Sequence, residues 1–199
     1  MFESAGKKRW IFACILIWSV CIAIGLLALL RYSNTPGALA KPPEEWPRAA
    51  SIAPSSQRST FLLFVHPQCP CSRASVGELA RIIACCKDSV DTTVFFVVPR
   101  QAPAGFEQGD LWNSAASIPS VRVVIDKDAV AAKQFGARTS GQALLYDQGR
   151  RLAFSGGITA FRGHSGDNDG RDAIVALLRG QRPQHITTPV FGCALLGES

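Results

Sequence analysis

The sequence predicts an α/β domain with a central mixed sheet, preceded by one N-terminal transmembrane helix. Short continuous apolar runs alternate with segments of helical period, which is the pattern of an α/β domain. The last two apolar runs flank a turn signal, so we expect the sheet to end in an antiparallel hairpin. The transmembrane helix is predicted because Trp10 to Leu30 is 21 residues without a charge, and about 20 apolar residues cross a bilayer as a helix.

Residues 1–9 are expected to stay in the cytoplasm, because the basic run 7–9 precedes the apolar stretch and only Arg31 follows it directly. We therefore expect residues 10–30 to anchor the chain in the cell inner membrane as a single pass, with the C-terminal domain facing the periplasm or extracytoplasmic side. A cleaved signal peptide is the alternative, because residues 38–40 (ALA) have the small-x-small form of a cleavage site. The apolar stretch is longer than a signal core of ~7–15 residues, which favours the anchor.

The charge pattern excludes one class of partner. The formal net charge is +6, and residues 1–31 contribute half of it with four basic groups and one acidic group. The other 17 basic and 14 acidic groups are scattered, without a basic run or interleaved aromatic residues. We therefore expect no nucleic-acid partner.

The chain after the anchor is predicted to hold one domain. Residues 31–58 are rich in Pro, Ala and Ser without an apolar period, which is typical of a linker. The domain is expected over 59–182, and a C-terminal tail with Cys193 over 183–199. The expected strands are 60–65, 92–98, 121–125, 142–146 and 151–154. The expected helices are 71–86, 110–117, 128–135 and 171–179, with Asp169 as the N-cap of the last one.

Two cysteines separated by one proline, Cys69-Pro70-Cys71, stand between the first predicted strand and the first predicted helix. The thiolate is the reactive form of cysteine, and the N-terminus of a helix lowers a thiol pKa. Cys69 is therefore the predicted nucleophile. Side chains two residues apart on a helix do not face each other, so a Cys69–Cys71 disulfide would need a distorted first turn. Strained disulfides are the more easily reduced ones.

The stretch FLLFVHPQCPCSRASVGELARI, residues 61–82, resembles the active-site strand and helix of exported thioredoxin-like proteins. In that family an apolar strand leads into W-C-x-x-C-R. The parallel β-α-β opening and the final hairpin also match the thioredoxin fold. The resemblance implies that Cys69 replaces the attacking cysteine and Arg73 the arginine. Ser72 then stands in the place of the second cysteine, and Cys71 is an additional thiol one position earlier.

Further motifs bear on the resemblance to known families. Residues 139–141 (TSG) stand where thioredoxins have a cis-proline loop, but no proline is present. The combination of HPxCPC, TSG, SGGIT and FGC is similar to membrane-anchored bacterial proteins labelled RedB.

The remaining cysteines of the domain are weaker candidates. Cys193 either resolves disulfides formed on Cys69 or fastens the tail to the domain, and a structural role or an unpaired thiol is favoured. Cys85 lies 16 residues after Cys69, about 24 Å along a straight helix, which excludes direct pairing with the motif. Cys86 belongs to the apolar stripe of the helix, and Cys85 lies off it.

These patterns predict an anchored, extracytoplasmic thiol–disulfide oxidoreductase without a cofactor. Its catalytic residues are expected to be Cys69 as the nucleophile, Cys71 as the resolving thiol and His66 as a proton carrier. Its partners are expected to be extracytoplasmic protein thiols and disulfides, and the membrane through the N-terminal helix. The alternative is a copper(I) chaperone or assembly factor that binds copper with Cys69, Cys71 and either His66 or His164. A peroxide reductase is disfavoured, because the T-x-x-C context is missing.

Overall fold

A computed structural model describes residues 3–196, which separate after Thr35 into a helical unit and a domain. The helical unit is α1 (Glu3–Asn34). Its segment Lys7–Asn34 has a mean hydropathy of 2.8, and is long and apolar enough to cross a membrane. Its tryptophans and leucines are exposed.

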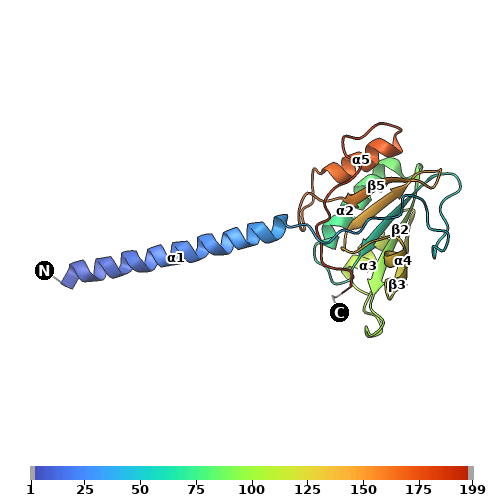
Figure 1. The fold of residues 1–199 in the computed structure, drawn as a ribbon. Coiled ribbons are helices and arrows are strands. Elements are labelled where there is room, and N and C mark those ends of the chain that lie inside the picture. Colours follow the sequence, from blue (N-terminus) through green and yellow to red (C-terminus); the bar gives the residue numbers. More distant parts are fainter. Residues whose placement is uncertain (1–2, 197–199) are drawn as a thin grey trace. The chain divides into compact units, whose positions relative to one another are not determined.

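The domain is built on a five-stranded mixed sheet with strand order β3-β2-β1-β4-β5 (Figure 1). The strands are β1 (Ser59–Val65), β2 (Val90–Val98), β3 (Val121–Lys127), β4 (Gln142–Tyr146) and β5 (Leu152–Gly157). The first three strands pair in parallel, while β4 is antiparallel to both β1 and β5. The predicted parallel opening and final hairpin are therefore confirmed. The domain has a thioredoxin-like fold.

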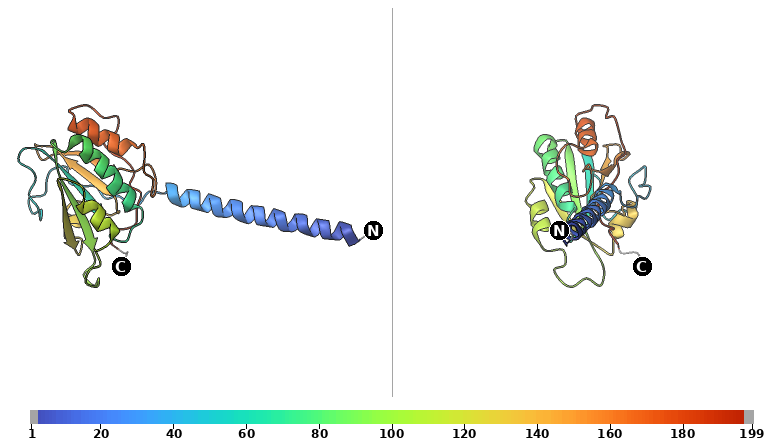
Figure 2. Two further views of the ribbon diagram at one scale, coloured as in Figure 1. Left: turned by 180° about the vertical axis from the view of Figure 1, so that it is seen from behind. Right: turned by 90° about the vertical axis from the view of Figure 1, so that its left-hand side faces the viewer.

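Four helices cover the two faces of this sheet (Figure 2). They are α2 (Ser72–Cys86), α3 (Asp110–Ala116), α4 (Val130–Gln134) and α5 (Asp169–Leu178). Successive β1 side chains alternate between two cores, so both faces are apolar. Phe61 and Leu63 pack with α2, α3 and α5, whereas Leu62 and Phe64 pack with α4 and residues before β1. This double burial explains why β1 is a continuous apolar run.

Two helix starts differ from the prediction. The helix expected from Asp128 begins at Val130, because Asp128 and Ala129 have positive φ angles of 58° and 53°. The buried Asp126 carboxylate accepts the N–H groups of the first turn of α4, at 2.9 and 2.8 Å. The N-cap of α5 is Asn168 and not Asp169, because the Asn168 side chain accepts the Arg171 N–H at 2.8 Å.

The segment expected to be a free linker lies on the domain from Pro36 onward. The Trp46 ring packs edge-on against Phe135 at 4.9 Å and Tyr146 at 5.1 Å, measured between ring centroids. The Tyr146 hydroxyl donates to the Pro43 carbonyl at 2.9 Å. Trp46, an aromatic residue in a Pro-rich segment, thus packs against the core that contains Leu62 and Phe64.

Candidate functional site

The Cys69-Pro70-Cys71 motif forms the turn that joins β1 to α2. The Cys69 N–H donates to the His66 carbonyl at 3.0 Å, and the Cys69 carbonyl accepts the Ser72 N–H at 3.1 Å. Cys71 is the N-cap of α2, with helical φ and ψ angles of −67° and −28°. Cys69 therefore lies just before the helix N-terminus, as the sequence predicts.

The Cys69 thiol is acidic although it is only 3% exposed. Burial raises its pKa, but hydrogen bonds from Ser72 and Cys193 outweigh burial and lower the pKa from 9.0 to about 7. A large part of Cys69 is consequently thiolate at neutral pH. This is the electronic state that nucleophilic attack on a disulfide requires.

A chain of hydrogen bonds leads from the main chain to the Cys69 sulfur. The Ser140 hydroxyl accepts the His66 N–H at 2.7 Å and contacts the Ser72 hydroxyl at 2.6 Å. Because Ser72 donates to the Cys69 sulfur, its oxygen is left to accept the proton of Ser140. The chain therefore points its donors toward the thiolate. Ser140 belongs to the TSG loop, so this loop contributes a hydroxyl to the Cys69 site.

Cys71 differs from Cys69 in its electrostatics. Burial raises the pKa of Cys71, and the negative charge of Cys69 raises it further, while the Arg162 guanidinium acts in the opposite direction. Arg162 comes from the glycine-rich loop after β5, and its guanidinium also donates to the Gly192 carbonyl. Arg162 was not predictable from the sequence. A lone arginine in a polar loop carries no pattern that distinguishes it.

Cys193 lies beside Cys69, where its main-chain N–H and its thiol both hydrogen-bond to the Cys69 sulfur. Burial, followed by these contacts with Cys69, raises the pKa of Cys193 to about 12. Three sulfur atoms, those of Cys69, Cys71 and Cys193, are thus gathered at one site, and all three thiols are free. Cys193 is thus an unpaired thiol in this structure, and it lies at the motif.

His66 and His164, the two candidate site histidines, each contact an aromatic ring. The half-buried His66 ring lies edge-on to Phe106 at 5.7 Å, and its Nδ1 accepts the Gln68 N–H at 3.2 Å. Burial lowers the pKa of His66, so the ring is neutral at pH 7. The His164 ring stacks on Phe161 at 4.1 Å. Among the residues that the structure describes, no three His, Cys, Asp or Glu side chains are arranged to hold a metal ion.

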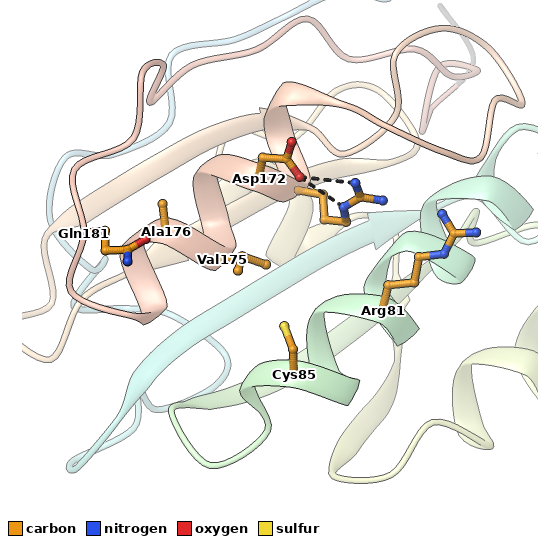
Figure 3. A pocket seen from close by; sticks show the side chains of 7 residues that line it. Arg81, Cys85, Asp172, Val175, Ala176 and Gln181 are labelled. Carbon is orange, nitrogen blue, oxygen red and sulfur yellow. Dashed lines mark hydrogen bonds and ion pairs between the residues drawn. The ribbon is translucent and has the colours of Figure 1, made fainter.

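Cys85 and Cys86 lie at the far end of α2, apart from the three-sulfur site. Cys86 is buried and Cys85 exposed, as predicted, and their sulfur atoms are 3.0 Å apart. Figure 3 shows Cys85 in a hollow between α2 and α5, opposite Val175 and Ala176. The hollow is lined by none of the three clustered cysteines.

A buried carboxylate ties the glycine-rich loop to α2. Glu78 is fully buried and pairs with Arg171 at 2.8 Å and with Arg81 at 2.9 Å. It also accepts the Gly166 N–H at 2.9 Å. This network, which the sequence analysis missed, holds the loop that carries Arg162. A glutamate at a core-facing position of a predicted helix was the available signal.

Comparison with known proteins shows likeness in structure without likeness in sequence. No protein-family model and no curated protein matches the chain. A hypothetical protein from Sinorhizobium meliloti 1021 is 18% identical over 82% of this chain and 96% of its own, with a TM-score of 0.57. An uncharacterized conserved protein from Geobacillus kaustophilus is 17% identical over 83% and 93%, with a TM-score of 0.58.

A secreted disulfide oxidoreductase from Mycobacterium tuberculosis is 14% identical over 62% of this chain and 82% of its own, with a TM-score of 0.43. At their identities the likenesses to the Sinorhizobium meliloti and Geobacillus kaustophilus proteins show the fold alone. The chemistry must be argued from the site itself.

Proposed function

We propose that the protein is a thiol–disulfide oxidoreductase whose nucleophile is Cys69, anchored by α1 with its domain on the extracytoplasmic side of the membrane. The observation that carries the proposal is the environment of Cys69, a thiol with a pKa of about 7 beside two further free thiols. A second thiol next to the nucleophile allows a mixed disulfide to be released.

The exported location is supported by the apolar helix α1 and by the basic run 7–9 that precedes its apolar part. Disulfides form and persist outside the cytoplasm, so the substrates are exported protein thiols and disulfides. The neighbouring pair at the end of α2 differs from this site, because burial raises the pKa of Cys86.

The test is reduction of insulin disulfides by the full chain in detergent micelles, with dithiothreitol as the electron source. We expect Cys69→Ser to lower the rate to that of dithiothreitol alone. Cys85→Ser, which changes an exposed thiol outside the site, is the matched control and should retain the wild-type rate. Equal rates for Cys69→Ser and wild type would contradict the proposal.

The same preparations distinguish a copper(I) carrier. Copper that copurifies with the wild type and is lost in Cys71→Ser, together with no insulin reduction by the wild type, would replace the oxidoreductase by the carrier. Thiolates are preferred Cu(I) ligands, so removal of one would weaken such a site severely.

A further inference from the structure

The tail that carries Cys193 is paired with the TSG loop through its main chain. The Ser140 N–H donates to the Cys193 carbonyl at 2.8 Å, and the Leu195 N–H donates to the Arg138 carbonyl at 2.9 Å. Between these bonds, Thr139 and Ala194 form an antiparallel bridge. Cys193 is therefore held like a residue of an added strand, with a defined direction for its side chain.

Side chains on both sides of Cys193 fix the tail in the same place. Val190 and Leu195 are buried, with exposed fractions of 0% and 1%. Gly192 lies so close to the TSG loop that a Cβ atom there would be 1.9 Å from the Ser140 carbonyl oxygen. Only glycine fits at this position, so the approach of the tail depends on it. The position of Cys193 beside Cys69 is thus determined by several independent contacts.

We propose that Cys193 is the resolving thiol, so that the reaction of Cys69 with a substrate ends in a Cys69–Cys193 disulfide. This assignment rests on the proposed function and names the second half of its site. Cys193 thus takes the resolving role that the sequence assigns to Cys71, because the position of Cys71 at the start of α2 suits that role less well.

The geometry of α2 distinguishes the two candidates. The Cys69 carbonyl accepts the Ser72 N–H at 3.1 Å, and the Cys71 carbonyl accepts the Ala74 N–H at 3.2 Å. The Cys71 thiol also hydrogen-bonds to Cys69, but a disulfide between cysteines only two residues apart would distort this hydrogen-bonded turn. Cys193 comes from a separate segment, so its bridge to Cys69 leaves the first turn unchanged.

The reaction has two exchange steps. The Cys69 thiolate attacks one sulfur of a substrate disulfide, which breaks that disulfide, expels one substrate thiolate and forms a mixed disulfide. Cys193 then loses its proton to the expelled thiolate, attacks the Cys69 sulfur and expels the second substrate thiolate, which takes a proton from solvent. The substrate gains two electrons, and the Cys69–Cys193 pair loses two. The reverse sequence oxidises a substrate dithiol.

The charge on Cys69 favours the sequence in which Cys69 reacts before Cys193. While Cys69 is a thiolate, its charge and hydrogen bonds keep the Cys193 proton in place, and Cys193 acts as a donor to the nucleophile. A mixed disulfide on Cys69 carries no charge, which removes this barrier to ionisation of Cys193. Burial, the largest cause of the raised pKa of Cys193, remains, so the reaction of Cys69 removes only the part of the rise that its own hydrogen bond and charge contribute.

The experiment treats the reduced full chain, in detergent micelles, with oxidised glutathione and maps the disulfides by tryptic mass spectrometry. Cleavage places Cys69 and Cys71 in peptide 59–73 and Cys193 in peptide 180–199. We expect the wild type to give 59–73 linked to 180–199. An internal disulfide within 59–73 would overturn the assignment to Cys193 and leave the oxidoreductase proposal standing.

Two variants separate the role of the thiol from that of the tail. Cys193→Ser should accumulate glutathione on Cys69, at least tenfold above wild type, because the second step is lost. Gly192→Ala keeps every thiol but displaces the tail, so it should accumulate the same mixed disulfide and also speed alkylation of Cys69. Cys85→Ser is the control and should match the wild type.

The remaining outcomes are equally decisive. If Cys193→Ser releases glutathione from Cys69 as fast as the wild type, Cys193 does not resolve. If neither the wild type nor any variant forms a disulfide at Cys69, this inference and the proposed function both fail.

Discussion

At the scale of single residues, Cys69 owes its acidity to donors more than to charges. Burial works against its thiolate, and the hydrogen bonds of Ser72 and Cys193 reverse that effect. Ser140 is linked to Cys69 indirectly, because its hydroxyl contacts the hydroxyl of Ser72. Ser140 therefore acts on Cys69 through Ser72, which makes Ser140 a positioning residue.

We expect Ser140→Ala to raise the pKa of Cys69 by roughly half to one unit, because a hydrogen bond contributes about 0.5–1.5 kcal/mol. The pH dependence of Cys69 alkylation, followed at peptide level, measures this shift. Ser72→Ala, which removes the direct donor, should raise the pKa at least as much. An unchanged midpoint in Ser140→Ala together with a raised one in Ser72→Ala would show that the chain does not point toward Cys69.

The lowered pKa of Cys69 also makes the stability of the folded domain depend on pH. The folded pKa of Cys69, about 7, is below its ordinary value of 9.0. The thiolate therefore contributes stability that is fully present above about pH 9 and is lost as the pH falls through about 7. We expect Cys69→Ser to lose the part of the pH dependence of unfolding that lies between these values, measured by urea unfolding of the full chain.

At the scale of elements, Glu78 joins α2 to the glycine-rich loop and to α5. We expect Glu78→Gln to lower the free energy of unfolding by about 3 kcal/mol, since it leaves Arg171 without its buried carboxylate. Urea unfolding followed by tryptophan fluorescence measures the loss. Arg81→Ala removes only the more exposed partner, and should cost less than about 1 kcal/mol. Equal losses in the two variants would contradict a central role for Glu78.

At the scale of the whole molecule, the order of helices and strands was predictable because its signals are local. The apolar runs of β1 and β2, the period of α2 and the turn before β5 each occupy a few consecutive residues. The Cys69 motif is equally local. The α4 start was misplaced because left-handed conformations at Asp128 and Ala129 are not encoded by glycine or asparagine.

The rest of the site depends on contacts between distant segments. Ser140, Arg162 and Cys193 meet Cys69 and Cys71 only once the sheet has formed, and no periodicity relates their positions. The packing of residues 36–58 on the domain is unpredictable for a similar reason. Its composition is that of a tether, yet one residue, Trp46, contributes the contacts that place it on the domain.

The topology of the whole chain is open to a direct test. We expect a reporter that is active only in the periplasm to be active when fused after Ser199, because the basic run 7–9 favours a cytoplasmic N-terminus. The same reporter fused before residue 7 is the control and should be inactive. The opposite pattern would place the thiols in a reducing compartment and remove the argument for disulfide exchange.

The close contact of Gly192 with the TSG loop also determines when the site becomes complete. Cys69 and Cys193 are separated by 124 positions in the chain, which ribosomes take about 6–25 s to synthesise at roughly 5–20 residues per second. During that interval the nucleophile exists without the strand that later covers it. A chain that has not reached Cys193 therefore lacks the two hydrogen bonds that this residue donates to the Cys69 sulfur.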